Sequence, residues 1–182
     1  MDISFQAFTS EVDELIHFLT SETWEYHGQS NLSAQEIMTA YQNEKYTGDG
    51  NQTFWILFGE KKAGLIRIFD LHDPTPLFDL RILKSYRGRE IGEVAVKWLT
   101  DYIFTHYPEK TRIEGTTRQD NWAMRKVFHK CGFVKESHYR KAWPSQDGRI
   151  YDAVGYAILR EDWEEKKTTP VDWNDFEYEH NF

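Results

Sequence analysis

The sequence predicts an α+β fold in which one mixed, mostly antiparallel central sheet is flanked by helices. Short segments with alternating or continuous apolar residues predict strands, and segments whose apolar residues recur every three or four positions predict helices. In chain order these segments read β-α-α-β-β-β-α-β-α-β-β, and no internal repeat interrupts them. A length of 182 residues fits one domain with its own core.

The first three segments are a strand and two helices. Residues 3–8 alternate apolar and polar side chains, as a half-buried strand does. The apolar side chains of residues 12–19 recur at helical spacing, and Ser10 precedes them as the expected cap. A second helix is expected after Ser33, running to about Tyr41.

Three strands are expected next, at residues 53–58, 63–71 and 77–84. The short link between the first two contains a glycine, which predicts a hairpin, and two prolines break the chain before the third. The remaining segments are a long amphipathic helix from Ile91 to near Pro108, a strand at 112–117, a helix at 121–131 and strands at 133–143 and 150–159.

The overall charge limits the possible partners. A net charge of −8 argues against general nucleic-acid binding, which needs a positive field, and favours a cationic substrate or partner. No apolar run is long enough to span a bilayer, and the amino terminus does not resemble a signal peptide, so we expect no membrane partner and a cytoplasmic location. The single cysteine, Cys131, excludes an intramolecular disulfide.

The most informative stretch is Leu80–Gly92, which leads from a strand through a basic turn into the longest helix. A helix start presents unpaired backbone N–H groups, and Gly88 allows a ligand to approach the backbone. Arg87 and Arg89 add charge-assisted contacts. These features suit a pyrophosphate, and the alternative is a plain turn with solvated arginines. Neither a P-loop nor a G-x-G-x-x-G motif is present.

This turn resembles the R/Q-x-x-G-x-G/A acyl-CoA signature of the GNAT superfamily of N-acyltransferases. Arg87 matches its first position and Gly92 its last, whereas Glu90 stands where the central glycine usually lies. We expect the acidic side chain of Glu90 to point away from the ligand while its N–H faces it. Residues 112–133 resemble a second family segment, N-x-x-x-x-x-V/L-x-x-K-x-G-F after a strand.

The resemblance covers the chain to Trp163. It implies a GNAT-like N-acetyltransferase domain at residues 1–163, followed by an acidic, aromatic tail at 164–182. The last strand further resembles the branch that contains ribosomal-protein N-terminal and small-molecule acetyltransferases. The tail either packs on its own domain or serves as a dimer contact or lid, so a homodimer is possible.

The family pattern also implies acetyl-CoA as cosubstrate, with its pantetheine arm between strands 77–84 and 112–117. Backbone groups near Arg81 and Ile82 would polarise the thioester carbonyl. Arg125 and Lys126 either reach the phosphates or form a solvated helix face. The residues expected to contact the cofactor are Ile82, Leu83, Lys84, Arg87, Gly88, Arg89, Glu90, Ile91, Gly92, Asn121, Arg125, Lys126 and Phe128.

The acceptor amine must lose a proton, and Asp79 and Glu114 are the candidate catalytic bases because their strands flank the expected cleft. Exposed strand carboxylates without a role are the alternative. Many relatives place a tyrosine where this chain has Phe128, so protonation of the leaving thiolate is absent, unnecessary or done by another group. Cys131 is expected in the core, which predicts direct transfer without a covalent enzyme intermediate. Histidine spacing gives no sign of a metal site.

Three functions remain open from the sequence. The first is acetyl transfer to the primary amine of a small cationic molecule, which the negative net charge favours. The second is acetylation of protein N-terminal residues, which the branch resemblance suggests. The third is a catalytically idle acyl-CoA-binding module, which Phe128 and Glu90 support.

Overall fold

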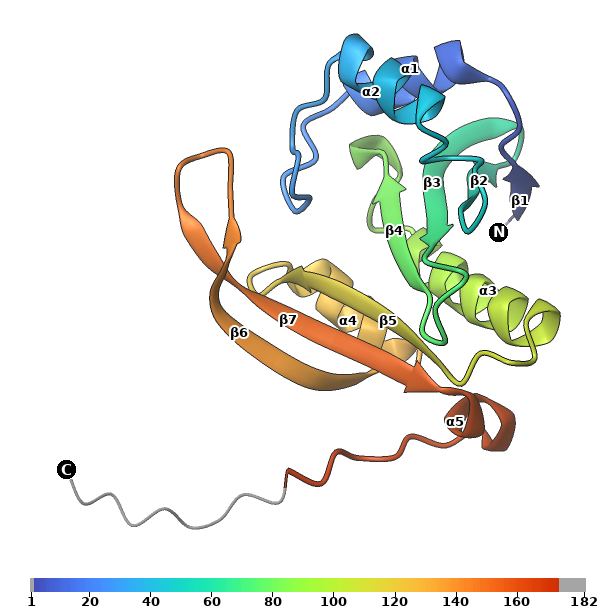
Figure 1. The fold of residues 1–182 in the computed structure, drawn as a ribbon, viewed down its shortest axis with the longest axis vertical. Coiled ribbons are helices and arrows are strands. Elements are labelled where there is room, and N and C mark those ends of the chain that lie inside the picture. Colours follow the sequence, from blue (N-terminus) through green and yellow to red (C-terminus); the bar gives the residue numbers. More distant parts are fainter. Residues whose placement is uncertain (1, 174–182) are drawn as a thin grey trace.

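The computed structural model describes residues 2–173, which form a seven-stranded sheet in the order β1-β2-β3-β4-β5-β7-β6 (Figure 1). The elements are β1 (Ile3–Ala7), α1 (Val12–Thr20), α2 (Ala34–Gln42), β2 (Gln52–Phe58), β3 (Lys61–Phe69), β4 (Leu77–Ile82), η1 (Lys84–Tyr86), α3 (Ile91–His106), β5 (Arg112–Arg118), α4 (Trp122–Lys130), β6 (Val134–Pro144), β7 (Ile150–Leu159) and α5 (Arg160–Glu165). The predicted fold class and element order are confirmed, with two short elements added, the 3₁₀ turn η1 before α3 and the helix α5 at the end.

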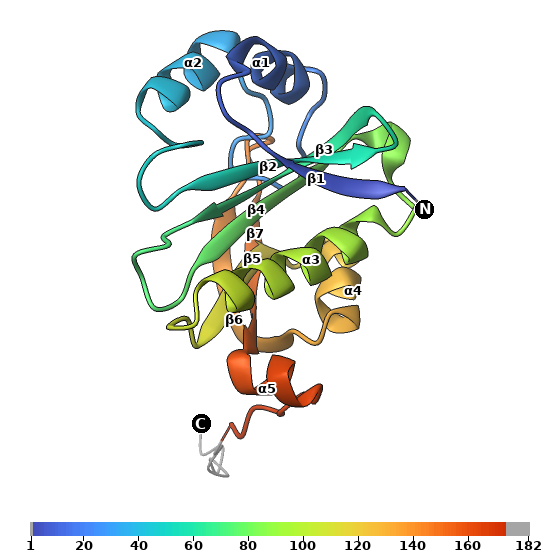
Figure 2. The ribbon, with the colours of Figure 1, turned by 90° about the vertical axis from the view of Figure 1, so that its right-hand side faces the viewer.

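The helices lie on both faces of the sheet (Figure 2). Helices α1 and α2 cover one face of β2 and β3, where Trp24 and Trp55 are fully buried. Helices α3 and α4 cover the other face and pack on the largest apolar cluster, which includes Leu99, Ile103 and Phe128. Each face therefore has its own apolar core, and the sheet is held from both sides.

The sheet opens between its fourth and fifth strands. Strands β4 and β5 run parallel and pair at one position, Leu77 with Glu114. Beyond this position the two strands diverge toward their carboxyl ends (Figure 1). The loop between α1 and α2 and the β6–β7 hairpin lie on the side toward which the strands open. This opening positions the candidate site.

Several element boundaries differ by a few residues from the sequence prediction, and two of them have a clear structural cause. Glu11, not Ser10, is the residue that flanks the start of α1, and neither side chain caps the helix, because the Glu11 carboxylate instead accepts the backbone N–H groups of Thr9 at 2.9 Å and Ser10 at 3.1 Å. Strand β4 ends at Ile82, and Lys84 starts the single 3₁₀ turn η1. The second helix begins where expected, with a capping box between Ser33 and Glu36.

After β7 the chain forms α5, which packs on the domain, whereas residues 166–173 are mostly exposed. The Trp163 ring lies 5.4 Å from Phe104, and its indole N–H donates to Asp101 at 2.7 Å. Trp173 is exposed. Phe176 and Tyr178, two further aromatic residues of the predicted tail, lie outside the described residues. Within residues 2–173, no helix has the length and apolar character that crossing a membrane requires.

Candidate functional site

A cavity of about 400 Å³ lies in the opening between β4 and β5. Its walls come from residues 26–29, from β3, β4 and β5, and from the first turns of α4. The polar side chains in these walls include His27, Asp79 and Arg81. Because the cavity joins the two faces of the sheet where main-chain pairing stops, two reactants can meet in it.

Asp79 joins two other side chains at the centre of the cavity wall. Its Oδ1 lies 3.0 Å from Nε2 of His27, and its Oδ2 lies 3.2 Å from Nε of Arg81. Burial raises the pKa of Asp79, but the charges of Arg81 and His27 outweigh it and hold this pKa well below its usual range. Asp79 is therefore ionised at neutral pH and is itself a weak proton acceptor.

The contacts of His27 define its tautomer. Its Nε2 lies 3.0 Å from the Asp79 carboxylate and 3.2 Å from the Leu80 carbonyl oxygen, and both of these groups only accept hydrogen bonds. Nε2 must therefore carry the hydrogen, which leaves the Nδ1 of a neutral ring with a free lone pair. This buried Nδ1 has no hydrogen-bond partner among the described residues. The Asp79–His27 pair thus has the arrangement of an oriented general base.

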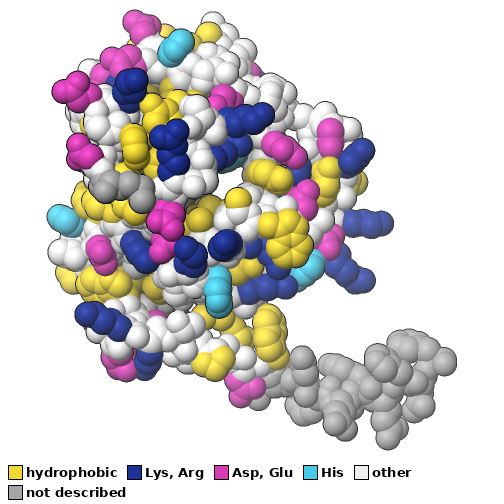
Figure 3. Space-filling model, turned by 180° about the vertical axis from the view of Figure 1, so that it is seen from behind, with side chains coloured by type: hydrophobic (Ala, Val, Ile, Leu, Met, Phe, Trp, Pro, Cys, Tyr) yellow, Lys and Arg dark blue, Asp and Glu magenta, His cyan; other side chains and the backbone are white. Residues whose placement is uncertain are grey.

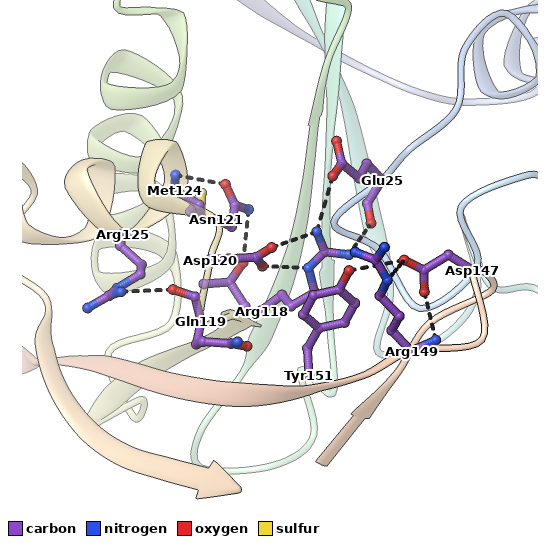
Figure 4. A network of polar contacts seen from close by, with 11 residues as sticks. Glu25, Arg118, Gln119, Asp120, Asn121, Met124, Arg125, Asp147, Arg149 and Tyr151 are labelled. Carbon is purple, nitrogen blue, oxygen red and sulfur yellow. Dashed lines mark hydrogen bonds and ion pairs between the residues drawn. The ribbon is translucent and has the colours of Figure 1, made fainter. Parts of the chain in front are cut away.

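The loop that carries His27 is fixed by a buried arginine at the end of β5 (Figure 4). The Arg118 guanidinium donates to the Glu25 carbonyl at 3.3 Å and to the Glu25 carboxylate at 3.2 Å. It also forms two bonds to Asp120, at 2.5 and 2.9 Å, and lies over the rings of Tyr26 and Tyr151. Arg118 thereby ties the α1–α2 loop to β5 and β7.

The turn before α3 has the backbone that the sequence suggested. Gly88 and Glu90 both adopt positive φ, at 76° and 61°, and Glu90 is the N-terminal residue flanking α3, with an exposed side chain. The first N–H groups of α3, from Ile91 to Glu93, have no acceptor within the helix. Arg87 and Arg89 are exposed beside them. An anion can therefore approach several backbone donors and two guanidinium groups here.

The open edge of β4 continues into this turn. Leu83 donates its N–H to Ala63 of β3, so the groups of Ile82 and Lys84 face the other way, as alternate residues of an extended chain do. Lys84 donates its N–H to the carboxylate of Glu22 at 2.6 Å, and Ile82 accepts from Arg87 at 2.9 Å. The two positions expected to pair with the pantetheine arm thus have intramolecular partners, and neither is among the residues that line the cavity.

The predicted α4 residues have local partners as well. Asn121 caps the helix by accepting the Met124 N–H at 3.2 Å, and its side-chain amide donates to Thr117 at 2.9 Å. Arg125 donates to the Gln119 carbonyl at 2.8 Å (Figure 4). Lys126 is exposed. Asn121 and Phe128 line the cavity, whereas Arg125 and Lys126 lie beside a groove on the outer side of α4.

The environments of Glu114 and Cys131 both argue against a direct catalytic role, which the sequence suggested for Glu114 but not for Cys131. Glu114 stands at the closed end of the opening, pairs with Arg112 at 3.5 Å and is not among the residues that line the cavity. Cys131 is partly buried, and this burial raises the pKa of its thiol to about 11, so the nucleophilic thiolate is scarce at neutral pH. Asp79 is thus the predicted carboxylate that reaches the cavity, and His27 is a site residue that the sequence patterns did not single out.

Comparison with known proteins agrees with the fold. Residues 3–134 match the family model described as an acetyltransferase (GNAT) domain. No curated protein matches the chain. A spermidine N-acetyltransferase from Vibrio cholerae, solved with CoA and spermine, superposes with a TM-score of 0.77 at 19% identity, over 89% of this chain and 98% of that one.

Two further solved structures are similar. A probable acetyltransferase superposes with a TM-score of 0.72 at 20% identity, covering 88% of this chain and 94% of its own. A dodecameric structure of spermidine N-acetyltransferase from Vibrio cholerae, in an intermediate state, gives 0.73 at 18% identity, over 90% of this chain and 97% of that one. At these identities the similarity is one of fold.

Proposed function

Because this chain belongs to the GNAT acetyltransferase family, we propose that it transfers the acetyl group of acetyl-CoA to the primary amine of a small molecule held between β4 and β5. The observation that carries the proposal is the Asp79–His27 pair in the wall of the cavity. It supplies the proton acceptor that acetyl transfer to an amine requires, at the place where the sheet opens.

The residues present suit acetyl-CoA, the cosubstrate of this family. The turn before α3 offers backbone N–H donors together with Arg87 and Arg89, which suit a diphosphate. The open edge of β4 offers the main-chain groups of Ile82 and Lys84, which suit the amides of a pantetheine arm. Acetyl-CoA must displace Glu22 and Arg87 from these groups to use them.

Proton transfer follows from the tautomer of His27. An alkyl amine is mostly protonated at neutral pH, and only its neutral form attacks a carbonyl carbon. Nδ1 of His27 accepts the proton, and Asp79 holds the ring through Nε2 and stabilises the positive charge that results. A carbon–nitrogen bond then forms as the carbon–sulfur bond of the thioester breaks, the sulfur leaves with the electron pair, and the acylated nitrogen releases its second proton to solvent.

Direct transfer within a ternary complex is the sequence of events that fits these residues. The raised pKa of Cys131 leaves its thiol protonated, so it is a poor acyl acceptor. Phe128 lines the cavity without a proton to donate. The thiolate of CoA is a good leaving group, and the proton on His27 is available to it after transfer.

The experiment that tests this function measures CoA release with acetyl-CoA and a panel of small amines, polyamines and peptides. We expect turnover with a small amine, and we expect His27→Ala to lower kcat by about 10²- to 10⁴-fold, the usual contribution of a general base. Turnover with peptides alone would favour acetylation of protein N-terminal residues. If CoA binds in the calorimeter but no amine yields product, the chain would be a catalytically idle acyl-CoA-binding module. If CoA does not bind, all three functions considered from the sequence would be refuted.

A further inference from the structure

The charges that line the cavity are mostly positive. Lys45, Arg67 and Arg81 lie in its wall, and Asp79 is the acidic residue among the lining side chains, which gives 3 − 1 = +2 with His27 neutral. The whole chain carries −8. The cavity therefore differs in charge from the chain as a whole. On the face shown in Figure 3, basic and acidic side chains are interspersed. The net charge of the chain therefore does not describe the charge that an acceptor meets.

The positive charges of these three side chains lie close enough to affect one another. The Arg67 guanidinium donates to Asn51 at 3.0 Å and to the Lys45 carbonyl at 3.3 Å, and both acceptors are neutral. Burial lowers the pKa of Lys45, and the nearby positive charges of Arg67 and Arg81 lower it further. Burial likewise lowers the pKa of Arg67. Asp79, already bound to Arg81 and His27, is too little negative charge to balance this group.

Three buried polar atoms in the cavity walls lack partners among the described residues. Two are donors, one terminal nitrogen of the Arg81 guanidinium and the indole nitrogen of Trp143. The third is Nδ1 of His27, which is an acceptor in the tautomer that Asp79 imposes. Buried polar atoms are nearly always satisfied, so this set suggests what a ligand brings. Two donors match the oxygens of an anion, and one acceptor matches the N–H of an amine.

We propose that the acceptor is an amine that carries its own carboxylate or phosphate, with the anion bound by Arg81, Arg67 and Lys45 and the amine beside His27. This inference rests on the proposed function, because it names the substrate class of the same cavity. Carboxylate and phosphate share the geometry that a guanidinium binds with two parallel hydrogen bonds.

The arrangement also places the two groups of the acceptor close together. Asp79 bonds to His27 through one oxygen and to Arg81 through the other, so the base and the guanidinium stand on either side of one carboxylate. An acceptor whose amine and anion lie close together, such as an amino acid or a phosphorylated amino alcohol, suits this arrangement. The same cations disfavour the protonated form of a bound amine, so they assist its deprotonation.

The test compares amines that differ only in the anionic group. The pairs are tyrosine with tyramine, lysine with cadaverine, and O-phosphoethanolamine with ethanolamine; spermidine is the cationic reference. We expect kcat/KM to be at least about tenfold higher for the anionic member of at least one pair, the size of one charge-assisted hydrogen bond. The tyrosine and lysine pairs report on a carboxylate, and the ethanolamine pair reports on a phosphate.

Two charge reversals make the comparison specific. Lys45→Glu should lower kcat/KM for the anionic acceptors by about 10- to 100-fold more than for the counterparts that lack the anionic group. Lys61→Glu changes the net charge equally, but Lys61 is exposed in the β2–β3 hairpin and does not line the cavity, so it should leave the preference intact. Calorimetric titration with tyrosine and O-phosphoethanolamine, in the presence of CoA, provides a readout without turnover.

The outcomes separate the two proposals. Turnover that favours spermidine or the amines without an anionic group would overturn the anionic acceptor and leave acetyl transfer standing. Binding of an anionic amine that Lys45→Glu abolishes, without turnover of any amine, would support the anionic site and refute the transfer. Equal effects of Lys45→Glu and Lys61→Glu would show that only the net charge matters, and would overturn the site.

Discussion

The carboxylate of Glu22 accepts the backbone N–H of Lys84 at 2.6 Å, across 62 positions of the chain. Its second oxygen lies 3.3 Å from the Arg87 guanidinium. An acidic side chain from the end of α1 therefore occupies a main-chain donor and an arginine that the proposed cosubstrate also needs. In the proposed binding mode, Glu22 and acetyl-CoA therefore compete for the same groups.

Removing the charge of Glu22 should strengthen the binding of CoA. In Glu22→Gln the side-chain oxygen can still accept the Lys84 N–H, but the negative charge near the diphosphate is lost. We expect the Kd for CoA, measured by calorimetry, to fall by about tenfold, or about 1.4 kcal/mol. The gain should shrink as salt is added, because screening weakens the repulsion in the parent protein. An unchanged Kd at low salt would show that the diphosphate lies elsewhere.

Asp79 and His27 should act as one unit. Asp79→Asn removes the charge that orients and stabilises the protonated ring, so we expect kcat to fall by about 10²-fold or more. The double variant with His27→Ala should lose little beyond His27→Ala alone, because the pair supports one step. In His27→Ala the remaining rate should rise with pH as free amine accumulates. Fully additive losses of kcat would show that the two residues act independently.

The same carboxylate should make stability depend on pH. The pKa of Asp79 in the folded chain lies below its ordinary value of 3.8, so its ionised form stabilises the fold above that pH. This contribution is lost as the pH falls through the folded-state pKa. The difference in unfolding free energy between the parent and Asp79→Asn should therefore shrink below about pH 4. Urea titrations at pH 7 and pH 3 measure it, and a constant difference would contradict the assignment.

Gly92 should tolerate no large side chain. A Cβ placed there would lie 3.4 Å from both Ile82 and Val127, so a phenylalanine must displace β4 or α4 at the start of α3. We expect Gly92→Phe to lose the thermal stabilisation that CoA gives the parent protein. Gly148→Asn, in the open β6–β7 turn, is the matched control, since asparagine tolerates a positive φ and no atom crowds that position. Normal stabilisation of Gly92→Phe by CoA would exclude this turn as the binding site.

Gly115 should be equally restricted, for a reason of packing. A Cβ there would lie 2.6 Å from the Phe128 ring, which is buried and stacks on Tyr156 at 4.6 Å. Gly115→Ala should cost about 1–3 kcal/mol and lower Tm by about 3–10 °C. Adding Phe128→Leu to that variant should recover part of the loss, because the smaller side chain leaves room. A calorimetric scan without any decrease would show that the ring moves freely.

The order of the elements was predictable because each depends on a local pattern. The α2 capping box at Ser33 and Glu36 lies within four residues, and the turn before α3 depends on neighbouring side chains. The end of β4 could not be predicted in the same way. Lys84 belongs to an extended pattern, but its N–H bonds to Glu22, 62 positions earlier in the chain, and a 3₁₀ turn starts there instead.

The candidate site was predictable in part. Asp79 was identifiable because it lies on a strand expected beside the cleft, whereas His27 lies in a loop that carries no local signal of a base. Only the fold brings the two together, from positions 52 residues apart in the sequence. The positive charge of the cavity could not be predicted either, because the residues that supply it lie far apart in the sequence. Lys45, Arg67 and Arg81 come from separate segments, and a net charge of −8 averages over all of them.

The single paired position of β4 and β5 has a mechanical consequence. Because Leu77 and Glu114 form the one rung between these strands, four strands stand on one side of it and three on the other. The angle between the two groups is set by side-chain packing, such as that of α3 against α4, and not by a ladder of main-chain bonds. A molecule that bonds to both strand edges completes the missing ladder. Binding of such a molecule in the opening should therefore also make the whole sheet more rigid.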